Sequence, residues 1–164
     1  MRAAILTISS SRARGELTDE SGTALAGFAR EIGAEVAGTE IVPDEQSKIE
    51  WALRHYADSE RCDLILTTGG TGFSPDDVTP EATRAVIDRV APGIGEAIRA
   101  ASREHTANWM LSRGVAGIRG GTVIVNFPGS PKSIGEAGEA IGAALPHAVS
   151  LVRDGATGHH EHGH

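Results

Sequence analysis

Residues 63–72 read Asp-Leu-Ile-Leu-Thr-Thr-Gly-Gly-Thr-Gly, and this segment gives the clearest indication of the fold. A short apolar run, Leu64–Leu66, leads into a glycine-rich turn, which is typical of a buried strand that ends at a tight connection. Similar runs predict strands at Ala3–Ile8, Val36–Val42 and Thr122–Phe127. Each of these runs is followed by a polar or glycine-proline segment, so we expect a sheet with buried strands.

Segments with helical spacing lie between the strands. Asp19 is placed to cap a helix that Gly33 ends, and Ser47 and Glu50 have the spacing of a capping box. Further helices are expected from Thr79 through Val90 to a break at Pro92-Gly93, from Ile94 to about Glu104, and from Ser133 to about Val152 with a break at Pro146.

Strands that alternate with helices predict an α/β fold with three αβα layers and a mostly parallel sheet. The Gly120-Gly121 turn favours antiparallel pairing of Val115–Ile118 with the strand that follows, so we expect one antiparallel strand at the edge. The 164 residues suit one domain, here 1–154, followed by a disordered histidine-rich tail at 155–164.

Composition excludes several classes of protein. Fifteen Lys plus Arg against 22 Asp plus Glu give a net charge of −7, which argues against a nucleic-acid partner. No segment approaches the ~20 apolar residues of a membrane span, so no membrane association is expected. Cys62 is the single cysteine, and the apolar run near the N-terminus is too short for a signal peptide, so we expect a cytoplasmic protein.

Polar residues gather where four predicted strands end, the position at which open parallel sheets bind ligands. They are Ser9–Arg12, Pro43-Asp44, Thr67–Gly72 and Pro128–Lys132. The glycine loop could cradle phosphate oxygens with its amide groups, or could simply be a tight turn. Asp44 and Asp77 could share Mg²⁺, or serve as ordinary turn and capping residues. Arg12 and Arg113 could pair with phosphate, or be solvated surface charges. Lys132 lies at a predicted helix start, where the helix dipole disfavours a cation, so a bound anion beside it is expected.

The segments together resemble the MoaB/MogA family of molybdenum-cofactor biosynthesis proteins. The matching segments follow the family's order along nearly the whole domain. They are Leu6–Ser9, Ile41–Glu45, Thr67–Gly72, Asp77–Ala82, Pro92–Glu96, Leu111–Arg113 and Pro128–Ser133.

The resemblance implies a nucleotidyltransferase that transfers AMP from Mg²⁺-ATP to the phosphate of molybdopterin and releases pyrophosphate. It further implies a homotrimer, with a molybdenum insertase as a candidate partner. Asp44 and Asp77 would be the catalytic, Mg²⁺-binding carboxylates. The residues that would bind nucleotide or molybdopterin are Ser9, Arg12, Thr68, Gly69, Gly70, Thr71, Gly72, Ser112, Arg113, Pro128, Gly129, Ser130 and Lys132.

The alternative is a non-catalytic molybdopterin-binding or scaffold module of the same fold, and a third interpretation is another nucleotide-dependent enzyme. Many family members carry Ser-Asp-Arg where this chain has Ser10-Ser11-Arg12. The tail histidines, from His159 to His164, are expected in a solvated segment, with transition-metal binding as the alternative.

Overall fold

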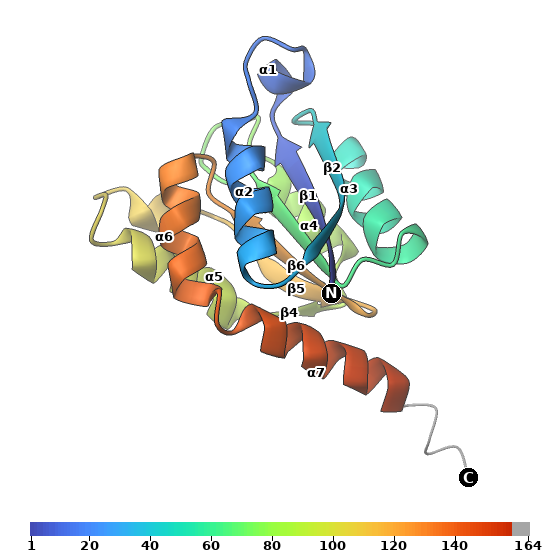
Figure 1. Cartoon of the computed structure of the whole chain (residues 1–164). Coiled ribbons are helices and arrows are strands. Elements are labelled where there is room, and N and C mark those ends of the chain that lie inside the picture. Colours follow the sequence, from blue (N-terminus) through green and yellow to red (C-terminus); the bar gives the residue numbers. More distant parts are fainter. Residues whose placement is uncertain (159–164) are drawn as a thin grey trace.

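A computed structural model, which describes residues 1–158, contains one six-stranded sheet in the order β2-β1-β3-β6-β5-β4 (Figure 1). The parallel strands are β1 (Arg2–Ile8), β2 (Glu35–Val42), β3 (Leu64–Thr68) and β6 (Thr122–Phe127). The inner strands β1, β3 and β6 are buried, apart from Arg2 at the start of β1, because helices cover the two faces of the sheet. The expected α/β fold with a mostly parallel sheet is confirmed.

The far edge of the sheet differs from the prediction. β5 (Ala116–Arg119) is antiparallel to β6, as expected, but the edge strand is β4 (Arg89–Val90), which pairs with β5. The prediction that Val90 lies in a helix is wrong, because that helix ends at Val86 and Ile87 is extended with ψ 147°. Gly117 permits the pairing, because a Cβ there would lie 2.7 Å from the carbonyl oxygen of Arg89.

Helices cover both faces of the sheet, whereas the four-residue helix that follows β1 lies beyond the ends of the strands (Figure 1). The helices are α1 (Ser10–Ala13), α2 (Glu20–Glu31), α3 (Gln46–Arg54), the π-helix η1 (His55–Ser59), α4 (Thr79–Val86), α5 (Pro92–Ser102), the 3₁₀ helix η2 (Trp109–Leu111), α6 (Pro131–Ile141) and α7 (Leu145–Gly158). α2, α5 and α6 bury Leu25, Ile98 and Ile134 against one face. α3 and α4 bury Ile49 and Val86 against the other, which completes the three layers.

Asp19 caps α2 as predicted, with its side chain accepting a hydrogen bond from the backbone of Gly22. The capping box predicted for α3 is wrong, because α3 begins at Gln46 and its N-cap, Glu45, makes no side-chain capping bond.

Three helix limits also differ from the prediction. Pro92 begins α5 instead of only ending the helix before it. The expected break at Pro146 falls at 142–144, between α6 and α7. α7 continues through Gly158, beyond the expected start of the tail at Gly155, and His159–His164 lie outside the described residues. No helix in residues 1–158 combines the length and hydropathy that crossing a bilayer requires.

Candidate active site

The carboxyl ends of β2, β1, β3 and β6 lie side by side at one edge of the sheet, so the polar segments that follow them meet there. The segments after β1 and β2 are joined by a reciprocal pair of hydrogen bonds. The Ser10 N–H donates to Asp44 Oδ2, and the Asp44 N–H donates to Ser10 Oγ, both at 2.9 Å. This pair fixes where the Asp44 carboxylate lies relative to the end of β1.

The glycine loop after β3 has a backbone conformation that only glycine adopts without strain. Gly69 and Gly70 have φ values of 96° and 68°, and a Cβ on Gly69 would collide with the carbonyl oxygen of Ile8. Thr79, the first residue of α4, holds the loop through two hydrogen bonds. Its hydroxyl donates to Gly69 O at 2.9 Å and its N–H donates to Gly70 O at 3.1 Å, so Thr79 anchors the loop, while α4 has no side-chain capping bond.

Thr79 bonds only to carbonyl groups of the glycine loop, and the loop N–H groups are not used in these bonds. Within residues 1–158, the N–H groups of Gly70, Thr71 and Gly72 donate to no protein acceptor. Successive N–H groups that point outward from a tight loop form an anion-binding concavity. The loop thus has the donors that a phosphate group needs.

The loop after β6 lies directly beside the glycine loop. Thr68, which is fully buried, donates its hydroxyl to Pro128 O at 2.6 Å, and Ser21 of α2 donates to Gly129 O at 2.7 Å. A Cβ on Gly129 would lie 3.7 Å from the Cα of Gly69. Ser130 then caps α6, which places the exposed side chain of Lys132 in the first turn of that helix.

Asp44 and Asp77 flank the glycine loop, and their carboxylates are bound in the same way. One oxygen of each accepts a backbone N–H: Asp44 Oδ2 from Ser10 at 2.9 Å, and Asp77 Oδ2 from Ser74 at 3.1 Å. Among the described residues, Oδ1 of each carboxylate accepts no hydrogen bond. Asp44 Oδ1 would lie 3.4 Å from a Cβ on Gly70, and Asp77 Oδ2 would lie 2.8 Å from one on Gly72.

Hard oxygen ligands of this kind suit Mg²⁺, which is commonly held by one or two carboxylates while water and substrate phosphates complete its shell. The described residues contain no group of three or more acidic, His or Cys side chains that could hold a metal ion by themselves. The donor set at Asp44 and Asp77 therefore fits a metal that is shared with a phosphorylated substrate.

Both predicted arginines donate to protein groups, Arg12 through one nitrogen and Arg113 through all three. Arg12 Nε donates to Thr18 O at 3.1 Å, within the segment that links α1 to α2. The Arg113 guanidinium donates to Gly72 O and Asp77 O, each at 2.7 Å, and forms an ion pair with Glu81. The hydrogen bond to Arg113 holds the pKa of the Glu81 carboxyl below its ordinary value.

Besides Ser130, the predicted set contains two serines, and both make local contacts. The Ser9 hydroxyl caps α1 by accepting the N–H of Arg12 at 3.3 Å. Ser112 lies between η2 and β5, and its carbonyl accepts a hydrogen bond from Arg99 at 3.4 Å.

Sequence reasoning missed a buried polar network beneath the site. Asn126 of β6 donates to the hydroxyls of Thr67 and Thr83, each at 3.0 Å, and its Oδ1 accepts the N–H of Val115. Thr83 in turn donates to the carbonyl of Thr79 at 2.9 Å, so the network reaches the residue that holds the glycine loop. An asparagine within an apolar strand segment is the one sequence signal that could have indicated this network.

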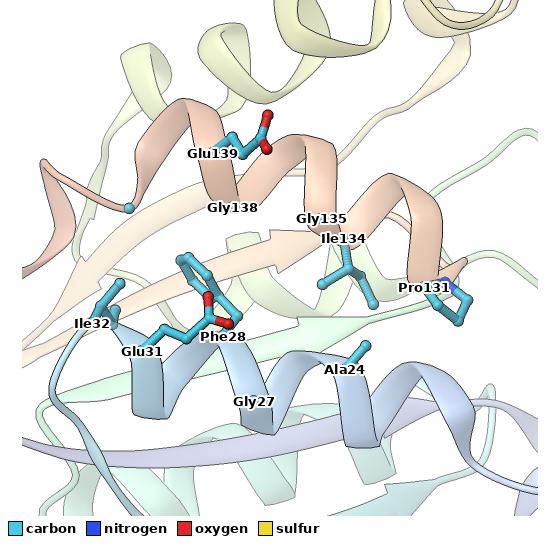
Figure 2. A pocket seen from close by; sticks show the side chains of 11 residues that line it. Ala24, Gly27, Phe28, Glu31, Ile32, Pro131, Ile134, Gly135, Gly138 and Glu139 are labelled. Atoms are coloured by element: carbon cyan, nitrogen blue, oxygen red, sulfur yellow. The ribbon is translucent and has the colours of Figure 1, made fainter.

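A hollow of about 500 Å³ lies between α2 and α6 (Figure 2), and its lining includes neither Asp44 nor Asp77. Phe28 and Ile134 point into it from opposite helices. The charged side chains that line it are Glu31 and Glu139, and the lining includes no Lys or Arg. Two carboxylates would repel a phosphorylated ligand in this hollow, so the carboxyl ends of the parallel strands are the better candidate site.

Residues 4–147 match the protein family described as "Probable molybdopterin binding domain". The chain belongs to this family. The family resemblance expected from the sequence is thereby confirmed. The match begins within β1 and includes the other five strands and every segment that contributes to the site described above.

Several known proteins are similar in sequence to this chain. The molybdopterin adenylyltransferase of Helicobacter pylori (strain J99) is 47% identical over 113 residues, which cover 69% of this chain and 64% of that protein. The molybdenum cofactor synthesis protein cinnamon of Drosophila melanogaster is 44% identical over 154 residues, 92% of this chain and 25% of that protein. The chain thus spans only part of the length of these relatives.

The molybdopterin biosynthesis enzyme MoaB from Thermus thermophilus has a similar structure. Its TM-score to this chain is 0.87, its sequence is 49% identical, and the match covers 93% of this chain and 96% of that one.

Proposed function

We propose that this protein is a molybdopterin adenylyltransferase. One observation carries the proposal: Asp44 and Asp77 flank an amide-lined glycine loop, and each presents one free carboxylate oxygen while the other is held by a backbone N–H. The name of the Helicobacter pylori relative supports the same reaction.

In this reaction a phosphate oxygen of molybdopterin attacks the α-phosphorus of ATP. A new P–O bond forms, the bond to the pyrophosphate oxygen breaks, and pyrophosphate leaves. The attacking phosphate is already ionised near neutral pH, so the site needs no nucleophile–base pair. It needs alignment of the reacting groups and stabilisation of negative charge.

The residues of this chain suit those two tasks. The N–H groups of Gly70–Gly72 would bind phosphate oxygens of the nucleotide, and Lys132 at the start of α6 would add a positive charge from the neighbouring loop. Asp44 and Asp77 would hold Mg²⁺, which when bound neutralises phosphate charge in the transition state. Ser9, Ser112 and Ser130 lie on the segments that surround this loop and are candidates for polar contacts with the substrates.

Mass spectrometry of molybdopterin incubated with the protein and Mg²⁺-ATP tests the proposal. The wild type should produce adenylylated molybdopterin, and Asp77→Asn should lose the product while keeping the fold. Asp76→Asn is the matched control, because Asp76 is the adjacent carboxylate but is exposed to solvent. Near-normal turnover by Asp77→Asn would contradict the proposed role of this carboxylate.

A non-catalytic molybdopterin-binding module is the second candidate that the sequence left open. It would retain the pocket without requiring Mg²⁺-ATP. Unchanged molybdopterin that copurifies with the wild-type protein, without adenylylated product, would favour that function.

The proposal extends to the assembly, the partner and the location of the protein. A homotrimer with one site per subunit is expected from the family, and a molybdenum insertase would receive the product. A cytoplasmic location agrees with the free thiol of the buried Cys62. Sedimentation of the purified chain would test the trimer directly.

A further inference from the structure

The Arg113 side chain closes the segment that runs from the glycine loop to Asp77. Its Nε donates to Gly72 O, where this segment begins, and its Nη2 donates to Asp77 O, where it ends, both at 2.7 Å. The Arg113 backbone N–H also donates to Thr71 O at 2.8 Å. One residue therefore fixes both ends of the segment that carries the Asp77 carboxylate.

The intervening residues have few other supports. Phe73, Ser74, Pro75 and Asp76 are all exposed, and the exposed fraction of Phe73 is 68%. Two hydrogen bonds join Ser74 and Asp77 to one another within the segment: Asp77 N–H to Ser74 O at 2.9 Å, and Ser74 N–H to Asp77 Oδ2 at 3.1 Å. These internal bonds shape the turn but do not attach it to the sheet, so its position depends on Arg113.

Glu81, in the first turn of α4, orients the guanidinium. The carboxylate of Glu81 pairs with Nη1, and its second oxygen lies 3.5 Å from Nη2. A planar guanidinium held by a carboxylate presents its remaining N–H groups in fixed directions, and here they meet the carbonyls of Gly72 and Asp77. The negative charge of Glu81 also offsets the positive charge of Arg113.

We infer that Arg113 and Glu81 form a positioning pair that holds Asp77 and the glycine loop in register, and that Arg113 does not serve as a phosphate ligand. This inference rests on the proposed adenylyl transfer for its kinetic consequence. The structural part of the inference rests only on the contacts of Arg113 with Gly72, Asp77 and Glu81.

A positioning role and a phosphate-binding role of Arg113 predict different kinetic effects of Glu81→Gln. If the pair positions Asp77, Glu81→Gln and Arg113→Lys should both lower kcat, by about 10- to 100-fold as expected for a small misplacement of a catalytic group. Both should also raise the Mg²⁺ concentration needed for half-maximal rate. If Arg113 were a phosphate ligand, Glu81→Gln would free its guanidinium, and the KM for ATP would fall or stay unchanged.

The pair formed by Arg119 and Asp58 provides a matched control. Arg119 donates to Asp58 through Nε and Nη2 and to the carbonyl of Val86 through Nη1, so it also joins one carboxylate to the backbone, through one carbonyl instead of two. It lies at the other end of the sheet, where β5 ends. Asp58→Asn should leave kcat and the Mg²⁺ requirement at wild-type values.

Hydrogen–deuterium exchange of the free protein gives a readout that does not depend on turnover. Amides of residues 72–78 should exchange faster in Arg113→Lys and Glu81→Gln than in the wild type or in Asp58→Asn, at unchanged melting temperature. Wild-type exchange in this segment would overturn the inference, as would a lower KM for ATP in Glu81→Gln. If the wild type makes no adenylylated product, the proposed function fails, whereas the exchange result still decides the positioning role.

Discussion

Ser10 and Asp44 exchange two hydrogen bonds across the ends of β1 and β2, in each of which the backbone N–H of one residue meets the side-chain oxygen of the other at 2.9 Å. The exchange has two consequences. The serine hydroxyl satisfies the backbone of Asp44, and the backbone of Ser10 orients the carboxylate. The Ser10 hydroxyl therefore contributes to stability, and the Asp44 carboxylate supplies the negative charge. Substitutions at Ser10 and at Asp44 can test these two contributions separately.

Ser10→Ala should lower the free energy of unfolding by about 1 kcal/mol, because the Asp44 N–H loses its acceptor in a partly buried position. The carboxylate itself keeps the Ser10 N–H, so adenylyl transfer should be reduced but present. Urea unfolding measures the loss of stability, and an adenylyl-transfer assay on the same preparation measures the remaining turnover.

Asp44→Asn should show the opposite pattern. An amide oxygen can still accept the Ser10 N–H, so the unfolding midpoint should stay near the wild-type value. Turnover should be lost, because a neutral amide is a poor Mg²⁺ ligand. Turnover equal to the wild type in this variant would remove Asp44 from the proposed metal site.

Gly69→Ala should destabilise the protein more than Gly33→Ala does. Both glycines have left-handed φ values, 96° and 91°, so each alanine carries a similar backbone strain of about 1–2 kcal/mol. A Cβ on Gly33 would meet nothing within 4 Å, whereas one on Gly69 would collide with the carbonyl oxygen of Ile8. The collision should cost about a further 1–3 kcal/mol.

Denaturant midpoints of the two variants measure this difference. Equal midpoints would mean that the glycine loop can move away from β1, which would contradict its role as a rigid phosphate cradle.

The sheet shows which parts of the fold the sequence can and cannot predict. The edge at which the site lies was predictable, because apolar runs followed by polar segments mark where parallel strands end. The two-residue strand β4 was not, since Val90 continues the helical spacing of Ala82 and Val86 and only the extended backbone at Ile87 interrupts it.

The same limit applies within the site. Asp77 and the glycine loop carry local signals, namely a carboxylate before a helix and clustered glycines. Arg113 and Glu81 are 32 positions apart, and no local pattern indicates that one guanidinium joins α4 to the loop. Ionic contacts between distant segments depend on the tertiary fold, which the periodicity of a single sequence does not specify.

Thr83→Val should destabilise the protein by about 1–2 kcal/mol, because the buried amide of Asn126 loses one of its acceptors while the shape of the side chain is kept. Asn126→Leu should cost more, since it leaves the N–H of Val115 without its acceptor and removes the donor to Thr67. Thr23→Val is the matched control: Thr23 also donates to a carbonyl four residues earlier, at 3.0 Å from Asp19 O, but it is exposed.

The control should change stability by less than about 0.5 kcal/mol. Thermal unfolding of the three variants tests the order. A Thr83→Val variant as stable as Thr23→Val would show that the network beneath the site is not needed for stability.

Tyr56 is the chain's single tyrosine, so its ionisation can be followed by ultraviolet absorbance without interference from another phenol. Burial, followed by a hydrogen bond to Glu40 and the negative charge of that carboxylate, raises the pKa of Tyr56 from 10.0 to about 12. The ring packs over β2, where a Cβ on Gly38 would lie 2.8 Å from its Cε1. The tyrosinate band of the folded protein should therefore appear near pH 12.

The sign of the linked stability follows from the raised pKa of Tyr56. The unfolded chain loses the phenolic proton near pH 10 and the folded chain near pH 12, so stability is fully present below pH 10 and falls as the pH rises between the two values. Glu40→Gln should lower the pKa of Tyr56 but leave it above 10, because burial is the larger cause. A tyrosinate band that rises near pH 10 while the far-ultraviolet circular dichroism is unchanged would contradict the packing of Tyr56 against β2.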